Sequence, residues 1–173
     1  GIIAKVTAHQ LEQSVNFERA MRYGAEIGKE KNARAHFNES IEHFDKLSHK
    51  VEEEIKQAEA LTEAAIGAVH TTEEKQEFQH VLKLLKNIET EHKSYEQHSH
   101  AAFGLIKIGN LHGAYERAEQ IETEEEKLNH ELEALEEEIM KFTDKAAKKA
   151  EHDEQTALVQ INIAATVAIG FGI

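Results

Sequence analysis

The chain has 173 residues, with 33 acidic and 20 basic side chains, and its formal charge is −13 at pH 7 with histidine neutral. This acidity argues against nucleic acid as a partner, because phosphate contacts need clustered lysine and arginine. The chain contains no Pro, which favours long helices and makes an all-β fold untenable. It also contains no Cys, which excludes a disulfide framework and a thiolate zinc site.

Apolar residues recur every three or four positions through most of the chain, as they do on the buried face of a helix. This spacing predicts four long helices, over residues 3–30, 35–69, 72–107 and 111–150. The first is the least regular, and its apolar positions are Ile3, Val6, Leu11, Val15, Phe17 and Met21. Short connections between helices of similar length predict an all-α, antiparallel up-down-up-down four-helix bundle.

Turn signals separate these helices. Thr71-x-x-Glu74 has the spacing of a capping box, which starts a helix. Gly109-Asn110 is a turn dipeptide, because both residues tolerate a left-handed backbone. The glycines and asparagine of region 24–32 give a weaker signal. One uninterrupted first helix over residues 3–69 therefore stays open as an alternative, and it would place the two chain ends far apart.

Residues 157–173 carry no charged side chain, although the stretch falls short of the roughly 20 residues that span a bilayer. We expect the fourth helix to continue into this stretch as the start of a truncated transmembrane helix. The N-terminus is also apolar and lacks Met, so we interpret the chain as a fragment with both ends continuing into membrane. An even number of helices would bring both ends to one side. A C-terminal helix buried in a partner is the alternative.

Two stretches near the chain ends resemble bacterial methyl-accepting chemotaxis receptors. Residues 7–13 (TAHQLEQ) and 17–20 (FERA) resemble the region just outside the first membrane span of these receptors. Residues 150–155 (AEHDEQ), followed by the apolar tail, resemble the approach to the second span. The middle of the chain is similar only in being long, acidic and helical.

The resemblance implies that residues 1–156 are the periplasmic sensor domain of a receptor in the bacterial inner membrane, and that residues 157–173 begin its second span. It also implies a homodimer that binds a small molecule, or a ligand-loaded partner. The signal would pass as a displacement of the last helix, which couples the sensor to the membrane.

A set of basic side chains forms the candidate ligand site, because a guanidinium matches a carboxylate with two parallel hydrogen bonds. These residues are Arg19, Arg22, Arg34, Arg117, Lys107 and His112. The expected ligand is a small organic anion. Arg19 and Arg22 lie on the first helix, which lines the dimer interface in the resembled receptors. The alternative for Arg22 is ordinary pairing with Glu18 or Glu26 along the helix.

A polar layer is expected inside the bundle. His92 and Glu125 lie at similar distances on either side of the turn at Gly109, and Ser48 lies at a comparable distance from the first connection. An antiparallel bundle would bring the three to one level. The layer would either fix the register of the helices or form part of a ligand site.

No residue set supports an enzyme or a cofactor site. The pairs Glu77/His80 and Glu89/His92 both fall on the third predicted helix, whereas a di-iron bundle needs such pairs on different helices. A Gly-rich phosphate loop and a nucleophile elbow are also lacking. We therefore expect no enzymatic activity, no cofactor and no metal. A scaffolding bundle, and a metal-binding bundle using some of the 12 histidines with glutamates, remain alternative interpretations.

Overall fold

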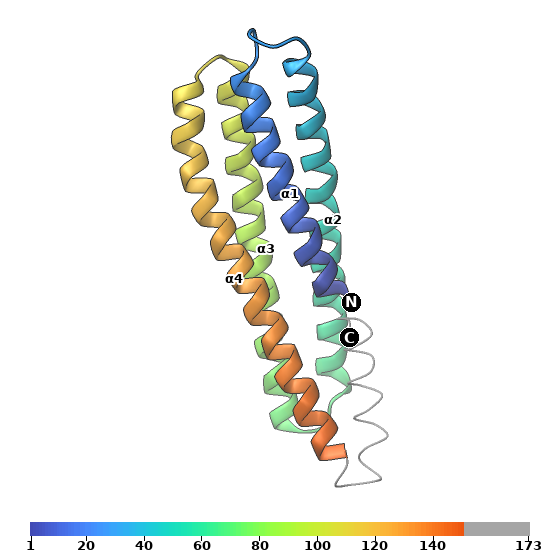
Figure 1. Ribbon diagram of the computed structural model, residues 1–173. Coiled ribbons are helices and arrows are strands. Elements are labelled where there is room, and N and C mark those ends of the chain that lie inside the picture. The colour runs from blue at the N-terminus through green and yellow to red at the C-terminus, as the bar shows by residue number, and fades with distance from the viewer. Residues whose placement is uncertain (151–173) are drawn as a thin grey trace. The chain divides into compact units, whose positions relative to one another are not determined.

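The computed structural model describes residues 1–150, which form four helices and no strand (Figure 1). The helices are α1 (Ile2–Ala25), α2 (Ala33–Ala68), α3 (Thr72–Lys107) and α4 (Leu111–Ala150). The predicted all-α fold with four helices is therefore confirmed. In this part of the chain no helix combines the length and the apolar character that crossing a membrane requires. The predicted transmembrane start at 157–173 lies outside the described residues.

Residues 26–32 interrupt the helix between α1 and α2, so the alternative of a single helix over 3–69 is wrong. Gly28 has a φ angle of 89° and Asn32 a φ angle of 74°. Such left-handed conformations cannot continue a right-handed helix, and Gly and Asn are the residues that tolerate them best. Helix α1 consequently ends at Ala25, earlier than the predicted bound at residue 30.

The predicted turn after α3 is confirmed. Gly109 has a φ angle of 81°. Its N–H donates to the carbonyl of Ile106, and the N–H of Asn110 donates to the carbonyl of Leu105, both at 2.9 Å. This pair of bonds is a Schellman motif, which satisfies the last carbonyls of α3. The Asn110 side chain then accepts a hydrogen bond from the Gly113 N–H at 3.0 Å and so caps the start of α4.

The predicted start of α3 is also confirmed. The Thr71 hydroxyl accepts a hydrogen bond from the Glu74 N–H at 3.2 Å and donates to the Glu74 carboxylate at 2.7 Å. The threonine thus satisfies one of the N–H groups that have no partner within the first turn of a helix.

The described residues pack into two compact units. The first unit contains residues 1–6, 53–89 and 130–150, and the second contains residues 7–52 and 90–129. The second unit holds both connections that end α1 and α3, so consecutive helices run antiparallel within it (Figure 1).

Aromatic rings fill the core of the second unit. They belong to Phe17, Phe37, Phe44, Tyr95 and Phe103. The rings of Phe44 and Phe103 lie edge to face, with centroids 5.4 Å apart and planes at 89°. This arrangement places the positive edge of one ring against the negative face of the other.

The buried face of α1 differs from the sequence prediction. Leu11 and Val15 were expected to face the bundle, but their side chains are 51% and 44% exposed. Gln10, Gln13 and Ser14 are buried in their place. The helix therefore contributes polar groups to the interior of the second unit.

Candidate functional site

A polar pocket of about 240 Å³ lies between α1 and α2 in the second unit. Its lining residues are Asn16, Arg19, Arg22 and Tyr23 from α1, and His36, Glu39, Ser40 and His43 from α2. Residues three, four or seven positions apart share a face of a helix. The spacing within each group therefore explains why both helices present several polar side chains to the same pocket.

The two guanidinium groups of the pocket, from Arg19 and Arg22, form no ion pair among the described residues. Both side chains are exposed. The Arg22 Cζ atom lies 5.0 Å from the centroid of the Tyr23 ring, which is within the range of a cation–π contact. Glu26, one of the expected partners of Arg22, lies 4.0 Å from Lys29 instead. The guanidinium donors thus remain open to a ligand.

The α2 wall of the pocket is held by local contacts. The His36 ring packs against the Tyr23 ring with centroids 4.9 Å apart. Its Nδ1 atom lies 3.6 Å from the Glu39 carboxylate, and its backbone carbonyl accepts a hydrogen bond from the Ser40 hydroxyl at 2.8 Å. The pocket therefore combines two arginines and two histidines with one carboxylate, so its charge is opposite in sign to that of the whole chain.

The remaining basic candidates do not line this pocket. Arg34, Lys107, His112 and Arg117 all belong to the second unit but lie outside the lining. His112 pairs with Glu116 on its own helix, with His112 Nε2 3.4 Å from the carboxylate oxygen. The structure thus brings together Arg19 and Arg22 and separates them from the other four.

His92 lies in the interior of the second unit and is fully buried. Its Nε2 atom lies 3.0 Å from the side-chain oxygen of Gln13 on α1. Burial lowers the pKa of His92 to about 4, with a smaller contribution from the charge of Lys93, so the ring is neutral near pH 7. An amide oxygen only accepts hydrogen bonds, so Nε2 carries the proton and Nδ1 carries a lone pair.

Several interior polar atoms lack a hydrogen-bond partner among the described residues. They include His92 Nδ1, Ser48 Oγ, Gln13 Nε2 and both polar atoms of the Gln10 side chain. Such atoms are few in folded proteins, since each carries an uncompensated desolvation penalty. The sequence pattern did not single out Gln10 or Gln13, because the apolar positions nearby suggested a different buried face.

Glu125, the third residue of the expected polar layer, is half-buried on α4. Burial raises the pKa of its carboxyl, and the nearby Ser14 side chain opposes that shift. Burial likewise raises the pKa of Tyr95, and the charge of Glu125 adds to this effect. Glu125, Ser14 and Tyr95 are therefore electrostatically coupled within the second unit.

Two further histidines pair with carboxylates on neighbouring helices. His98 Nδ1 lies 2.7 Å from the Glu124 carboxylate on α4, and His100 Nε2 lies 2.9 Å from the Asp45 carboxylate on α2. These pairs join residues far apart in the sequence, so the sequence could not identify them. Some of the histidines therefore form contacts between neighbouring helices.

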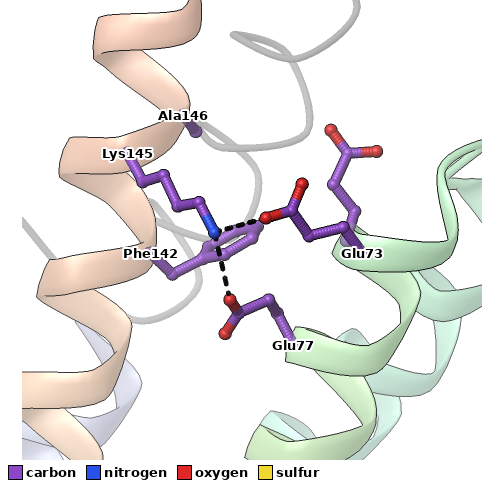
Figure 2. Close-up of a pocket in the computed structure, with 6 residues that line it drawn as sticks. Glu73, Glu77, Phe142, Lys145 and Ala146 are labelled. Atoms are coloured by element: carbon purple, nitrogen blue, oxygen red, sulfur yellow. Dashed lines mark hydrogen bonds and ion pairs between the residues drawn. The ribbon is translucent and has the colours of Figure 1, made fainter.

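A smaller pocket of about 40 Å³ lies between α3 and α4 in the first unit. Figure 2 shows the Lys145 side chain extending toward the carboxylates of Glu73 and Glu77, beside the Phe142 ring. The Lys145 Nζ atom lies 2.6 Å from Glu73 and 3.5 Å from Glu77. The volume suits roughly one to three water molecules, and the cation is already paired. We therefore interpret this pocket as a helix contact and not as a ligand site.

Comparison of the chain with protein-family models, with curated proteins and with solved structures finds no match in any of the three. The described residues define an all-α helical protein with an arginine-lined polar pocket, and the functional argument rests on that pocket.

Proposed function

We propose that the chain is the extracytoplasmic sensor module of a transmembrane chemotaxis receptor in the bacterial inner membrane, and that it binds a small organic anion without catalysing a reaction. The observation that carries the proposal is the pocket shared by Arg19 and Arg22. Two guanidinium groups without ion pairs, in a chain of charge −13, form a local positive site. Their fork geometry suits a carboxylate.

Signal transmission would use the ends of α1 and α4. Residues 1–6 and residues 130–150 belong to the same unit, which supports an arrangement in which both chain ends approach one side of a membrane. In this proposal residues 157–173 begin the second membrane span. Ligand binding shifts the equilibrium between two positions of the last helix. The likeness of residues 7–13 to chemotaxis receptors supports the same interpretation.

A homodimer is part of this proposal, with a second copy packed against α1. Leu11 and Val15 lie one helical turn apart, and both are largely exposed. Arg22 follows Val15 by seven residues and so shares its face of the helix. A second copy seated on Leu11 and Val15 would therefore lie beside the pocket.

Isothermal titration calorimetry with a panel of mono-, di- and tricarboxylic acids tests the anion proposal. We expect one class of acid to bind the wild-type chain, with an affinity at least about tenfold lower in Arg22→Ala, because a charge-assisted pair is lost. Arg34→Ala is the matched control, since Arg34 does not line the pocket, and it should bind like wild type. Absence of binding for every acid, or an equal loss in both variants, would reject the proposal.

A further inference from the structure

A group of three potential metal ligands lies in the interior of the second unit. Three ligand atoms lie within 4.8 Å of one another: a ring nitrogen of His92 and one carboxylate oxygen each of Glu52 and Glu96. Glu52 is on α2, whereas His92 and Glu96 lie one turn apart on α3 and so share a face of that helix. His92 is fully buried, and both glutamates are half-buried. The arrangement depends on the packing of two helices and not on one acidic stretch.

The state of the His92 ring is a second and independent observation. Gln13 accepts the hydrogen bond from Nε2, which leaves the lone pair on Nδ1. That Nδ1 atom is buried and has no hydrogen-bond partner among residues 1–150. Histidines that ligate metals almost always donate their other ring N–H to a carbonyl or a carboxylate, which fixes the tautomer. Gln13 fulfils this role for His92.

We propose that Glu52, His92 and Glu96 bind a divalent transition-metal ion through His92 Nδ1 and one oxygen of each carboxylate. One nitrogen and two oxygens form a donor set that suits Zn²⁺ and its neighbours in the first transition series. The two carboxylates balance the charge of the ion. This inference uses none of the residues of the anion pocket and holds independently of the proposed sensor function.

The geometry needs only small side-chain movements. Tetrahedral zinc holds its ligands at about 2.0 to 2.2 Å, so neighbouring donor atoms lie roughly 3.4 Å apart. One ligand atom of each of the three residues lies within 4.8 Å of those of the other two, and rotation of the two half-buried glutamate side chains can close the difference. Three protein ligands leave a fourth position for water or for an anion, as in open zinc sites. A bound ion would link α2 to α3, and Gln13 would extend that link to α1.

Titration of the metal-free, 173-residue chain with Zn²⁺ in mild detergent tests the proposal. We expect one Zn²⁺ per chain, with an affinity at least about tenfold lower in Glu52→Gln and in Glu96→Gln. Co²⁺ should give the intense visible absorption of a four-coordinate site, and the same substitutions should remove it. Both substitutions preserve side-chain size at half-buried positions, and circular dichroism verifies that the variants fold.

Glu116→Gln provides the matched control. It removes the carboxylate from the exposed His112–Glu116 pair, which has the same four-residue spacing as His92 and Glu96. This variant should bind Zn²⁺ like wild type. The absence of one-to-one binding would overturn the proposal, as would Glu52→Gln or Glu96→Gln binding as tightly as wild type. An equal loss in Glu116→Gln would also overturn it, because it would assign the ion to surface histidines.

Discussion

His92 on α3 and Gln13 on α1 form a buried hydrogen bond, with the ring Nε2 atom 3.0 Å from the amide oxygen. Both side chains are fully buried. The bond joins two helices that are not adjacent in the sequence, and it determines which ring nitrogen carries the proton. Since burial also keeps the ring neutral, the stability of the fold is linked to pH at this residue.

Acidification should destabilise the chain through His92. An unfolded histidine has a pKa near 6.5, whereas the folded value is lowered to about 4. The unfolded state therefore binds the proton first, so the contribution is full above about pH 6.5 and is lost as the pH falls toward 4. The loss amounts to at most about 3 kcal/mol. Urea unfolding at several pH values in this window, with a chelator present, measures it.

His92→Leu isolates this contribution, because leucine does not titrate. Its free energy of unfolding should fall less steeply with decreasing pH than that of wild type. Glu125 acts in the opposite direction: its pKa is raised, so its contribution is full at low pH and is lost as the pH rises through the folded value. Subtracting the free energy of unfolding of the variant from that of wild type at each pH removes the Glu125 contribution. Identical slopes for the two proteins would contradict the assignment.

The His92–Gln13 bond should appear as a coupling energy in a double-mutant cycle. Gln13→Leu leaves the buried Nε2–H without an acceptor and should cost about 1 to 3 kcal/mol. The same substitution in a His92→Leu background should cost much less, because no donor is then left unpaired. Denaturant unfolding of the four proteins gives the coupling. Additive effects of the two substitutions would show that the bond does not contribute.

The helices and their turns were predictable because both depend on local sequence. Apolar spacing located α2, α3 and α4, and residues such as Gly109 marked the turns. The buried face of α1 was not predictable, because Gln10 and Gln13 are buried while Leu11 is exposed. Hydrophobic spacing assumes that apolar residues face the core, and α1 departs from that assumption because it buries polar side chains beside the aromatic core of the second unit.

The candidate sites were predictable only where their residues share one helix. Arg19 and Arg22 lie three positions apart, so their proximity follows from helix geometry. The α2 side chains of the pocket, such as His36, could not be assigned because the register of α2 against α1 depends on packing. The same limit applies to Glu52, which approaches His92 only through the pairing of α2 with α3.

Two helical glycines should respond in opposite ways to alanine. A Cβ atom at Gly24 would lie 2.7 Å from two carbon atoms of the Ile106 side chain and 3.3 Å from the Phe37 ring. Gly24→Ala should therefore destabilise the chain by about 1 to 3 kcal/mol through overpacking. Gly104→Ala meets nothing within 4 Å and should stabilise α3 by up to about 1 kcal/mol. Thermal unfolding compares the two variants, and an equal response of both would contradict the packing described for Gly24.

At the pocket in the first unit, the contact between the Phe78 and Phe142 rings should stabilise the packing of α3 on α4 more than the ion pairs do. The Phe142 and Phe78 rings lie with centroids 4.8 Å apart, and Phe142→Ala should cost of order 2 kcal/mol. Lys145 is 56% exposed, so water and salt screen its attraction to Glu73 and Glu77. Lys145→Gln should therefore shift the urea midpoint far less than Phe142→Ala. A larger shift in Lys145→Gln would reverse this ranking.

The exposed apolar pair on α1 should control self-association. Leu11 and Val15 are 51% and 44% exposed, and their burial against a second copy would favour a dimer through the hydrophobic effect. We expect sedimentation equilibrium to show a wild-type dimer, which Leu11→Lys with Val15→Lys dissociates by placing like charges at the interface. Met140→Lys on α4 is the control, since Met140 is 58% exposed but lies on another helix. A monomeric wild type, or dissociation by Met140→Lys as well, would exclude this face of α1 as the specific interface.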